Sequence, residues 1–259
     1  MKGSITPLIL TLNEAPNIQR TLSRLTWATR IVVIDSFSTD ETRAIVGQFK
    51  QAVFIQRKFD SFAAQCNFGL QQIHTPWVLS LDADYILSEE FIEEIRNCNE
   101  AEAIDGYMVR FKYCVFGKTL RSTLYPPRTV LYRKEKASYH DEGHGHRVQI
   151  NGTTRALSSY IYHDDRKPLD RWLGEQNKYA ILEARNLLET SRQMLNSADR
   201  IRRGMVFAPV LIFFYTLFAK GLILDGWPGW FYVFQRTLAE ILLSLRLLEA
   251  KLKTHSADD

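Results

Sequence analysis

The run Trp77-Val78-Leu79-Ser80-Leu81-Asp82-Ala83-Asp84 decides the fold that we expect for this chain. It is apolar and β-prone up to Leu81, as in a strand buried within a sheet, and it then ends in two carboxylates that flank one small residue. Ligands of open α/β sheets bind in the crevice outside the carboxyl ends of the strands. The run therefore predicts a buried strand that brings two hard oxygen ligands for a divalent cation to that crevice.

The first third of the chain alternates between strand-like and helix-like patterns. We expect strands at 5–12, 31–34, 53–56 and 77–81. We expect the helices between them to begin at Asn13, at a capping box formed by Ser38 and Glu41, and near Phe62. This order predicts an α/β fold with a mostly parallel, Rossmann-like sheet that carries helices on both faces.

Beyond Asp84 the regular alternation gives way to less regular sequence. Ser88 is expected to open a helix, and 106–114 alternates like a strand. The stretch 116–146 is rich in loop-forming residues and, because rigid scaffolds place function on such loops, we expect it to form part of a site. A long helix is predicted from Asp170 to Met194.

The C-terminal region is the most apolar part of the chain and also carries its excess of positive charge. Residues 200–255 contain eight Lys or Arg and three Asp or Glu, whereas the whole chain has a net charge of only +4. Residues 204–219 are uncharged but shorter than the roughly 20 residues that span a bilayer. Trp230 and Tyr232 follow, as is typical of a membrane interface. These features favour an anionic membrane surface over nucleic acid as the partner.

We expect residues at about 204–250 to form a monotopic hairpin that lies in the cytoplasmic leaflet. The alternatives are a membrane-spanning pair of helices, and a soluble helical subdomain or dimer interface. The N-terminus lacks the apolar core of a signal peptide, so the rest of the chain is expected in the cytosol. Three widely spaced cysteines, without a metal-binding spacing, agree with a reducing compartment.

Polar residues at the ends of the predicted strands are expected to meet at one crevice. Asp35 ends the second strand, so it would share a site with Asp82 and Asp84. Three carboxylates would repel one another unless a cation or a nucleotide occupied the site, which predicts a metal-bound nucleotide. Asn13 and Glu14 end the first strand and enter the same crevice, although they could instead serve only as a helix cap and a first-turn acid.

Three segments in this order resemble a known family. They are Leu10-Thr11-Leu12-Asn13-Glu14-Ala15-Pro16-Asn17-Ile18, Val32-Val33-Ile34-Asp35-Ser36-Phe37-Ser38-Thr39-Asp40-Glu41-Thr42 and Leu81-Asp82-Ala83-Asp84. Together they resemble the inverting family 2 glycosyltransferases of GT-A fold, and more narrowly the bacterial subgroup that includes lipopolysaccharide core glucosyltransferases. The similarity continues near His163, at 177–180 and at 220–226.

The resemblance implies transfer of a sugar from a nucleotide diphosphate sugar to a hydroxyl of a glycolipid or oligosaccharide acceptor. Residues 1–115 would then form the nucleotide-sugar-binding half of a GT-A domain, and 116–165 the acceptor-side loops and strands. Residues 166–259 would form a helical region on the cytoplasmic face of the inner membrane. The acceptor would be a lipopolysaccharide core or a lipid-linked saccharide.

The resemblance also implies roles for individual residues. Asn13, Glu14 and Asp35 would line the nucleotide pocket. Asp82 would contact the ribose or the metal, and Asp84 would coordinate a Mg²⁺ or Mn²⁺ ion that bridges the diphosphate. His163 would complete the metal shell, as a histidine does in some related enzymes.

The acceptor-side loop departs from the pattern of the subgroup. Its usual His-Glu pair aligns here with His146-Arg147, and an arginine cannot act as the base. The nearby acids Asp141 and Glu142 are the alternative bases, whereas Arg147 would suit a phosphate. Two further arginines of this region, Arg128 and Arg133, could meet a phosphorylated or acidic acceptor.

Two other functions are compatible with the sequence. A metal-dependent nucleotidyltransferase also needs clustered carboxylates, but residues 11–18 lack the glycines of a triphosphate-binding loop. A catalytically impaired membrane adaptor would retain the fold and explain the missing His-Glu pair.

Overall fold

The computed structural model describes residues 4–98, 102–142 and 145–255, without the side chains of 141, 142, 145–147, 254 and 255. The chain divides into two compact units. The first comprises Met1–Thr119 and Leu124–Lys167, and the second comprises Leu120–Thr123 and Pro168–Asp259.

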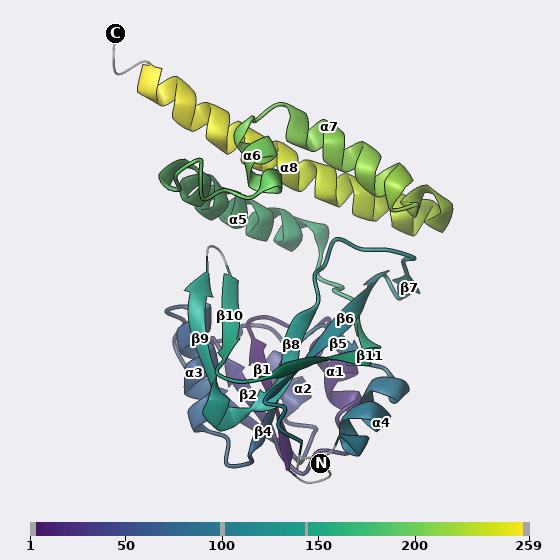
Figure 1. The fold of residues 1–259 in the computed structure, drawn as a ribbon. Coiled ribbons are helices and arrows are strands. Elements are labelled where there is room, and N and C mark those ends of the chain that lie inside the picture. Colours follow the sequence, from purple (N-terminus) through teal and green to yellow (C-terminus); the bar gives the residue numbers. More distant parts are fainter. Residues whose placement is uncertain (1–3, 99–101, 143–144, 256–259) are drawn as a thin grey trace. The chain divides into compact units, whose positions relative to one another are not determined.

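The first unit is built on one mixed sheet with the strand order β3-β2-β1-β4-β8-β6-β11-β5 (Figure 1). Its parallel half consists of β1 (Ile5–Thr11), β2 (Ile31–Asp35), β3 (Ala52–Gln56) and β4 (Trp77–Asp82). The other half consists of β5 (Tyr85–Leu87), β6 (Gly106–Val115), β8 (Arg128–Arg133) and β11 (Thr154–His163), and β7 (Lys118–Thr119) pairs with β6. Antiparallel pairing of β8 with β4 joins the two halves.

Helices cover both faces of this sheet, as the alternation of patterns predicts. The helices are α1 (Ile18–Ser23), α2 (Thr42–Val46), α3 (Phe62–Gln71) and α4 (Glu89–Asn97). Successive residues of a strand point to opposite faces, so Leu8 packs with Cys66 of α3, whereas Ile9 packs in the core that contains Leu22 of α1 and Phe91 of α4. The α/β class and the helices on both faces are thus confirmed.

Two of the predicted helix caps are wrong. α1 begins at Ile18, after Asn17, and Asn13 instead has a left-handed backbone with φ of 55°. α2 begins at Thr42, and the expected capping residue Ser38 donates its hydroxyl to Asp35. Both side chains form hydrogen bonds with residues outside the helices that the sequence predicts them to cap. These hydrogen bonds replace the capping hydrogen bonds to the backbone of the helix.

The expected loop at 116–146 is largely strand. Besides β7 and β8, the structure contains a hairpin of β9 (Ala137–Glu142) and β10 (Gly145–Ile150), with Glu142 opposite Gly145 in the register. These strands are stabilised by partners far along the chain. The side chain of Asn67 on α3, for example, donates a hydrogen bond to the carbonyl of Tyr139 and accepts one from its amide.

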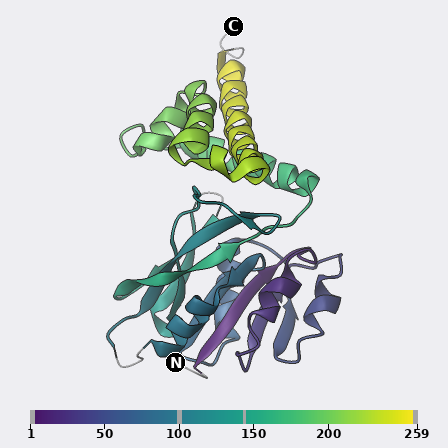
Figure 2. The same cartoon turned by 90° about the vertical axis from the view of Figure 1, so that its right-hand side faces the viewer.

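The second unit is helical. Its elements are α5 (Leu169–Glu189), α6 (Ser197–Arg203), α7 (Phe207–Phe214), a π-helical segment η2 (Tyr215–Ala219), a 3₁₀ turn η3 (Leu222–Asp225) and α8 (Gly226–His255). Figures 1 and 2 show α7 alongside α8, and Ala184 of α5 packs against Leu243 and Leu247 of α8. The predicted helix from Asp170 ends at Glu189 rather than Met194.

No single helix of the described residues is long and apolar enough to cross a membrane. Phe207–Ala219 and Leu222–Lys253 meet that criterion only as a pair, and the two helices are bent by 66° where they meet.

Candidate active site

The ends of β1 and β2 are joined by a network around Asp35, which is fully buried. One carboxylate oxygen accepts the Thr11 hydroxyl at 2.9 Å and the Ser38 hydroxyl, and the other accepts the Ser38 amide at 2.9 Å and the Gln56 side chain at 3.3 Å. The amide of Asn13 donates to Ser38 at 2.7 Å. Protein groups therefore fill the acceptor positions of Asp35, and only the long bond from Gln56 is easily exchanged.

Glu14 is the next acid at the end of β1, and it is buried. Its carboxylate accepts a hydrogen bond from Asn17 at 3.0 Å and lies 3.1 Å from the ammonium group of Lys167. Burial raises the pKa of Glu14 to about 7, against the opposing effect of Lys167 and with a contribution from the charge of Asp84. Glu14 thus titrates near neutral pH.

Asp84 and His163 form a buried pair at the end of β4. The antiparallel register of β5 and β11 sets His163 opposite Tyr85, so the imidazole Nε2 lies 3.2 Å from an oxygen of Asp84. Burial disfavours both charges, but their mutual attraction outweighs it, which lowers the pKa of Asp84 and raises the pKa of His163. Tyr113 and Tyr125 pack edge-on against the imidazole and fix its orientation.

The pair of Asp84 and His163 has atoms available to a cation. The second oxygen of Asp84 and Nδ1 of His163 are buried, and no described residue hydrogen-bonds to either of them. A buried carboxylate oxygen without a donor is costly, and carboxylate and imidazole ligands suit Mn²⁺. These residues therefore fit a divalent metal, although no three His, Cys, Asp or Glu side chains of the described part of the chain are gathered as a complete set of ligands.

Hydrogen bonds and ion pairs connect the segment after His163 to α1. Asp164 is buried and accepts bonds from Arg20 at 2.6 Å and from Arg166 at 3.0 Å. Asp165 accepts a bond from Asn17 at 2.8 Å, and Asn17 also bonds Glu14. This network connects the ends of β1 and β11, and it contains Arg20 and Lys167, which sequence reasoning did not single out.

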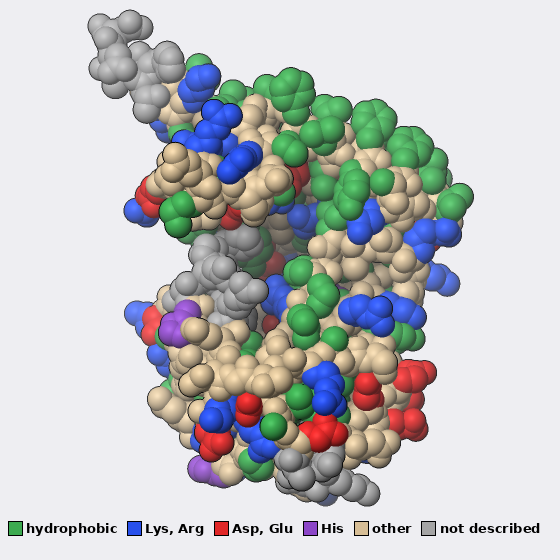
Figure 3. Space-filling model, viewed as in Figure 1, with side chains coloured by type: hydrophobic (Ala, Val, Ile, Leu, Met, Phe, Trp, Pro, Cys, Tyr) green, Lys and Arg blue, Asp and Glu red, His purple; other side chains and the backbone are tan. Residues whose placement is uncertain are grey.

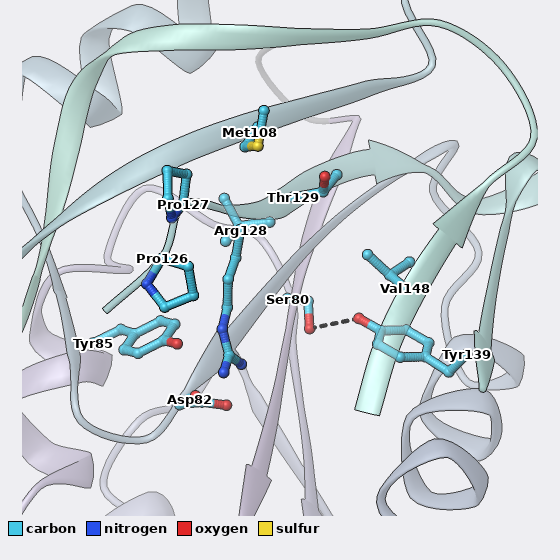
Figure 4. A pocket seen from close by; sticks show the side chains of 11 residues that line it. Ser80, Asp82, Tyr85, Met108, Pro126, Pro127, Arg128, Thr129, Tyr139 and Val148 are labelled. Atoms are coloured by element: carbon cyan, nitrogen blue, oxygen red, sulfur yellow. Dashed lines mark hydrogen bonds between the residues drawn. The ribbon is translucent and has the colours of Figure 1, made fainter. Parts of the chain in front are cut away.

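Asp82 lines a cavity of about 330 Å³ (Figure 4), and the charge of its carboxylate also acts on His163. Arg128 reaches across this cavity toward Asp82, and Tyr139 of β9 donates a hydrogen bond to Ser80 at 2.9 Å. Figure 4 also shows Tyr85 on the side of Asp82, below Pro126 and Pro127. The cavity thus lies between the end of β4 and the strands β8 and β9.

The expected base residues lie in a part of the chain whose side chains are not described. Asp141 and Glu142 are the last two residues of β9, and His146 and Arg147, whose side chains are likewise not described, belong to β10. The backbone places Asp141 and Glu142 on the strand that supplies Tyr139 to the cavity.

Comparison with known proteins gives the class. Residues 8–155 match the family described as Glycosyl transferase family 2, and the chain belongs to this family. It is a glycosyltransferase, as the three N-terminal segments predict.

Individual relatives are more distant. The chain is 25% identical over 238 residues to the lipopolysaccharide core biosynthesis glycosyltransferase LpsC of Rhizobium meliloti, which covers 88% of this chain and 86% of LpsC. It is also 25% identical over 265 residues to an uncharacterized glycosyltransferase of Rickettsia felis, covering 96% of this chain and 91% of the relative.

Among solved structures, the mannosyltransferase PcManGT of Pyrobaculum calidifontis, in complex with GDP-Man and Mn²⁺, superimposes with a TM-score of 0.55. The alignment covers 96% of this chain and 88% of the mannosyltransferase, at 13% identity. This likeness in fold agrees with the GT-A architecture expected from the sequence.

Proposed function

We propose that this enzyme transfers a sugar, with inversion, from a nucleotide diphosphate sugar to a hydroxyl group of a membrane-linked glycan. The observation that carries the proposal is the buried pair of Asp84 and His163, each with an unsatisfied atom, at the carboxyl ends of β4 and β11 in the mixed sheet. The relation to LpsC supports a lipopolysaccharide core or lipid-linked acceptor, and the GDP-Man and Mn²⁺ of the Pyrobaculum enzyme support the type of donor and metal.

In this proposal the ends of β1 and β2 bind the nucleotide, and the ends of β4 and β11 bind the metal ion. Asn13, Glu14 and Asp35 line the nucleotide pocket, with Asp35 giving up its long bond to Gln56 for a nucleotide hydroxyl or amine. Asp84 and His163 would hold Mg²⁺ or Mn²⁺, together with Asp82. When bound, the metal supplies positive charge that stabilises the diphosphate leaving group.

The acceptor hydroxyl must lose its proton as the new glycosidic bond forms. A carboxylate on the face opposite the diphosphate accepts this proton in a single displacement, which inverts the anomeric centre. Asp141 or Glu142 is the base in this proposal, since both end the strand that contributes Tyr139 to the cavity.

The donor site is tested with the full-length protein and a panel of nucleotide sugars. In Mn²⁺, a cognate donor should raise the melting temperature by mass action and should be hydrolysed slowly. Asp84→Ala should lose the Mn²⁺-dependent hydrolysis, whereas the exposed control Glu93→Ala should keep it. Absence of both stabilisation and hydrolysis across the panel in the wild type would overturn the proposal.

The base is tested by Glu142→Gln and Asp141→Asn in a transfer assay. One of the two substitutions should lower transfer about a hundred- to ten-thousandfold, the usual contribution of a general base. Normal transfer by both single variants would exclude this pair.

We propose further that the second unit docks on the cytoplasmic face of the inner membrane. Its α7, η2 and α8 expose large apolar side chains, and Figure 3 shows such side chains gathered on one face of these helices. The most exposed include Phe207 at 68%, Phe218 at 57% and Trp227 at 85%. Lys220 lies over the ring of Tyr215, which places a cation beside this apolar surface, as anionic headgroups require.

Vesicle flotation tests this docking. Phe218→Ser combined with Trp227→Ser should reduce flotation with anionic vesicles, because each removes an exposed apolar side chain from the membrane-facing surface. Met194→Ser, an equally exposed residue of the same unit outside α7 and α8, is the matched control. Equal flotation of all three proteins, or a concentration-dependent dimer that the double variant abolishes, would contradict membrane docking.

A further inference from the structure

The cavity beside Asp82 contains a cation that the proposed chemistry does not use. Arg128 is the first residue of β8 and follows Pro126 and Pro127, which restrict the backbone that leads into the strand. Its guanidinium lies 4.8 Å from the centroid of the Tyr125 ring and points toward Asp82 (Figure 4). Among the described residues none forms a hydrogen bond or an ion pair with it, while the charges of Asp82 and Asp84 attract it, so its donors can reach a ligand in the cavity.

The other cations of the site are engaged by protein carboxylates. Lys167 lies 3.1 Å from Glu14 and 3.4 Å from Asp165. Arg133, which the sequence suggests equally as an acceptor contact, lies over the ring of Trp77 and 3.7 Å from Asp105. The structure thus separates the two arginines of β8, because Arg133 has a structural role and Arg128 faces the cavity.

The rest of the cavity wall suits a sugar ring. Hydroxyl groups and apolar surfaces alternate around it, contributed by Ser80, Thr129, Tyr139, Met108 and Val148. Burial holds the pKa of Tyr139 well above its usual value, so this hydroxyl remains protonated. A cavity of about 330 Å³ whose wall combines polar groups with apolar surface has the size and the chemistry of a site for a small polar molecule.

We propose that this cavity binds an acceptor sugar that carries an oxyanion, either a phosphate or a carboxylate, and that Arg128 binds this group. The guanidinium fork matches such oxygens with two parallel hydrogen bonds. The inference rests on the proposed function, in which Asp84 and His163 serve the donor diphosphate and the base ends β9 beside the cavity. The negative charge of Asp82 repels an oxyanion in the same cavity. Because Mn²⁺ bound at the proposed metal site would offset this charge, the oxyanion should bind more tightly when Mn²⁺ is present.

Isothermal titration calorimetry of the full-length protein tests this assignment. The probes are glucose 6-phosphate, glucuronate and glucose, each with Mn²⁺ and with or without UDP or GDP. An anionic sugar should bind wild type about tenfold or more tightly than glucose, and Arg128→Gln should remove this preference. Arg110→Gln on the neighbouring strand β6, where the side chain is exposed and bonds only a carbonyl at Ser158 among the described groups, should keep it.

Several results would overturn the proposal. They are equal affinity of wild type for glucose and both anionic sugars, an unchanged preference in Arg128→Gln, or inorganic phosphate that competes as well as the sugar phosphate. If Arg128→Gln loses as much affinity for UDP or GDP as for the anionic sugar, Arg128 serves the donor diphosphate instead. Should this variant fail to fold, Arg128→Lys, which keeps the charge and loses the fork, replaces it and should show a reduced preference.

The titrations without nucleotide separate this inference from the donor proposal. If neither nucleotide binds the wild type but the anionic sugar preference depends on Arg128, the donor assignment fails and the anionic subsite stands.

Discussion

The ends of β2 and β4 are similar in sequence but differ in chemistry. Each strand flanks β1, is largely apolar and leads to a buried aspartate. Thr11, Ser38 and Gln56 supply donors to both oxygens of Asp35. Asp84 has His163 on one oxygen, and no described residue hydrogen-bonds to the other. A carboxylate whose acceptor positions are filled stabilises the fold and binds a ligand only by exchanging one of its donors, whereas a buried oxygen without a donor marks the place of a ligand directly.

The largest effect is expected at the β4 end. Asp84→Asn should lower Mn²⁺-dependent donor turnover about a thousandfold, a loss of about 4 kcal/mol in transition-state stabilisation, because an amide is a poor metal ligand. Turnover measured in a Mn²⁺ titration, beside Glu93→Gln as the exposed control, checks this. If Asp84→Asn retained turnover at low Mn²⁺, Asp84 would not be a metal ligand, and the ends of β2 and β4 would not differ in function.

The β2 end should respond in stability. Asp35→Ala leaves the hydroxyl groups of Thr11 and Ser38 and the amide of Ser38 without their acceptor, at a cost of about 2–4 kcal/mol in the free energy of unfolding. Urea denaturation measures this loss, and Asp35→Asn, which keeps one acceptor oxygen, should lose less. A change within the error of the measurement would show that the network adds nothing to stability.

Glu14 at the end of β1 should make the free energy of unfolding depend on pH. Its pKa is raised from 4.5 to about 7 by burial, so between these values the folded protein binds a proton that the unfolded chain has lost. The stabilising effect of this proton is complete below about pH 4.5 and is lost as the pH rises through 7. Between pH 5 and 7.5, the free energy of unfolding of wild type should therefore fall by about 1–3 kcal/mol relative to Glu14→Gln. Parallel pH profiles of the two proteins would refute the raised pKa.

The smallest effect is expected for one donor of the Asp35 network. Ser38→Ala removes one hydrogen bond to Asp35 and one from the amide of Asn13, while the amide of Ser38 still donates to Asp35. The expected loss is about 1 kcal/mol in the free energy of unfolding. A double-mutant cycle with Asp35→Ala should show that the two losses are not additive, and full additivity would mean that the two residues act independently.

Much of the first unit could be predicted from its sequence. The strand at 77–82, the strand that ends at Asp35 and the α/β class follow from apolar runs bounded by polar residues. The predicted caps at Asn13 and Ser38 are wrong, because both side chains have other partners. Asn13 accepts a hydrogen bond from Thr39, and Ser38 accepts one from the amide of Asn13 and donates one to Asp35 at the end of β2. Local preference is worth about 1 kcal/mol and yields to such bonds.

The hairpin of β9 and β10 and the strand β8 could not be found in the same way. Their sequence at 116–146 contains prolines, glycines and histidines, which favour loops locally. Their partners, including Asn67 on α3 and the edge of β4, are brought near only by the folded sheet. Arg128 and Arg133 show the same limit, since only the structure separates the arginine that faces the cavity from the one that packs on Trp77.

Apolar periodicity and strand-end polarity are local properties, so the sequence alone predicts the parallel half of the sheet and the acids at its strand ends, and the three N-terminal segments predict the family by resemblance. The role of each acid depends on its surroundings in the folded protein. Both oxygens of Asp35 accept hydrogen bonds, whereas Asp84 keeps one buried oxygen without a donor beside His163 among the described residues. Glu14 is paired with Lys167, the last residue of the first unit. Burial and hydrogen-bond partners depend on contacts between distant segments, and these contacts set the pKa and the available lone pairs of a carboxylate.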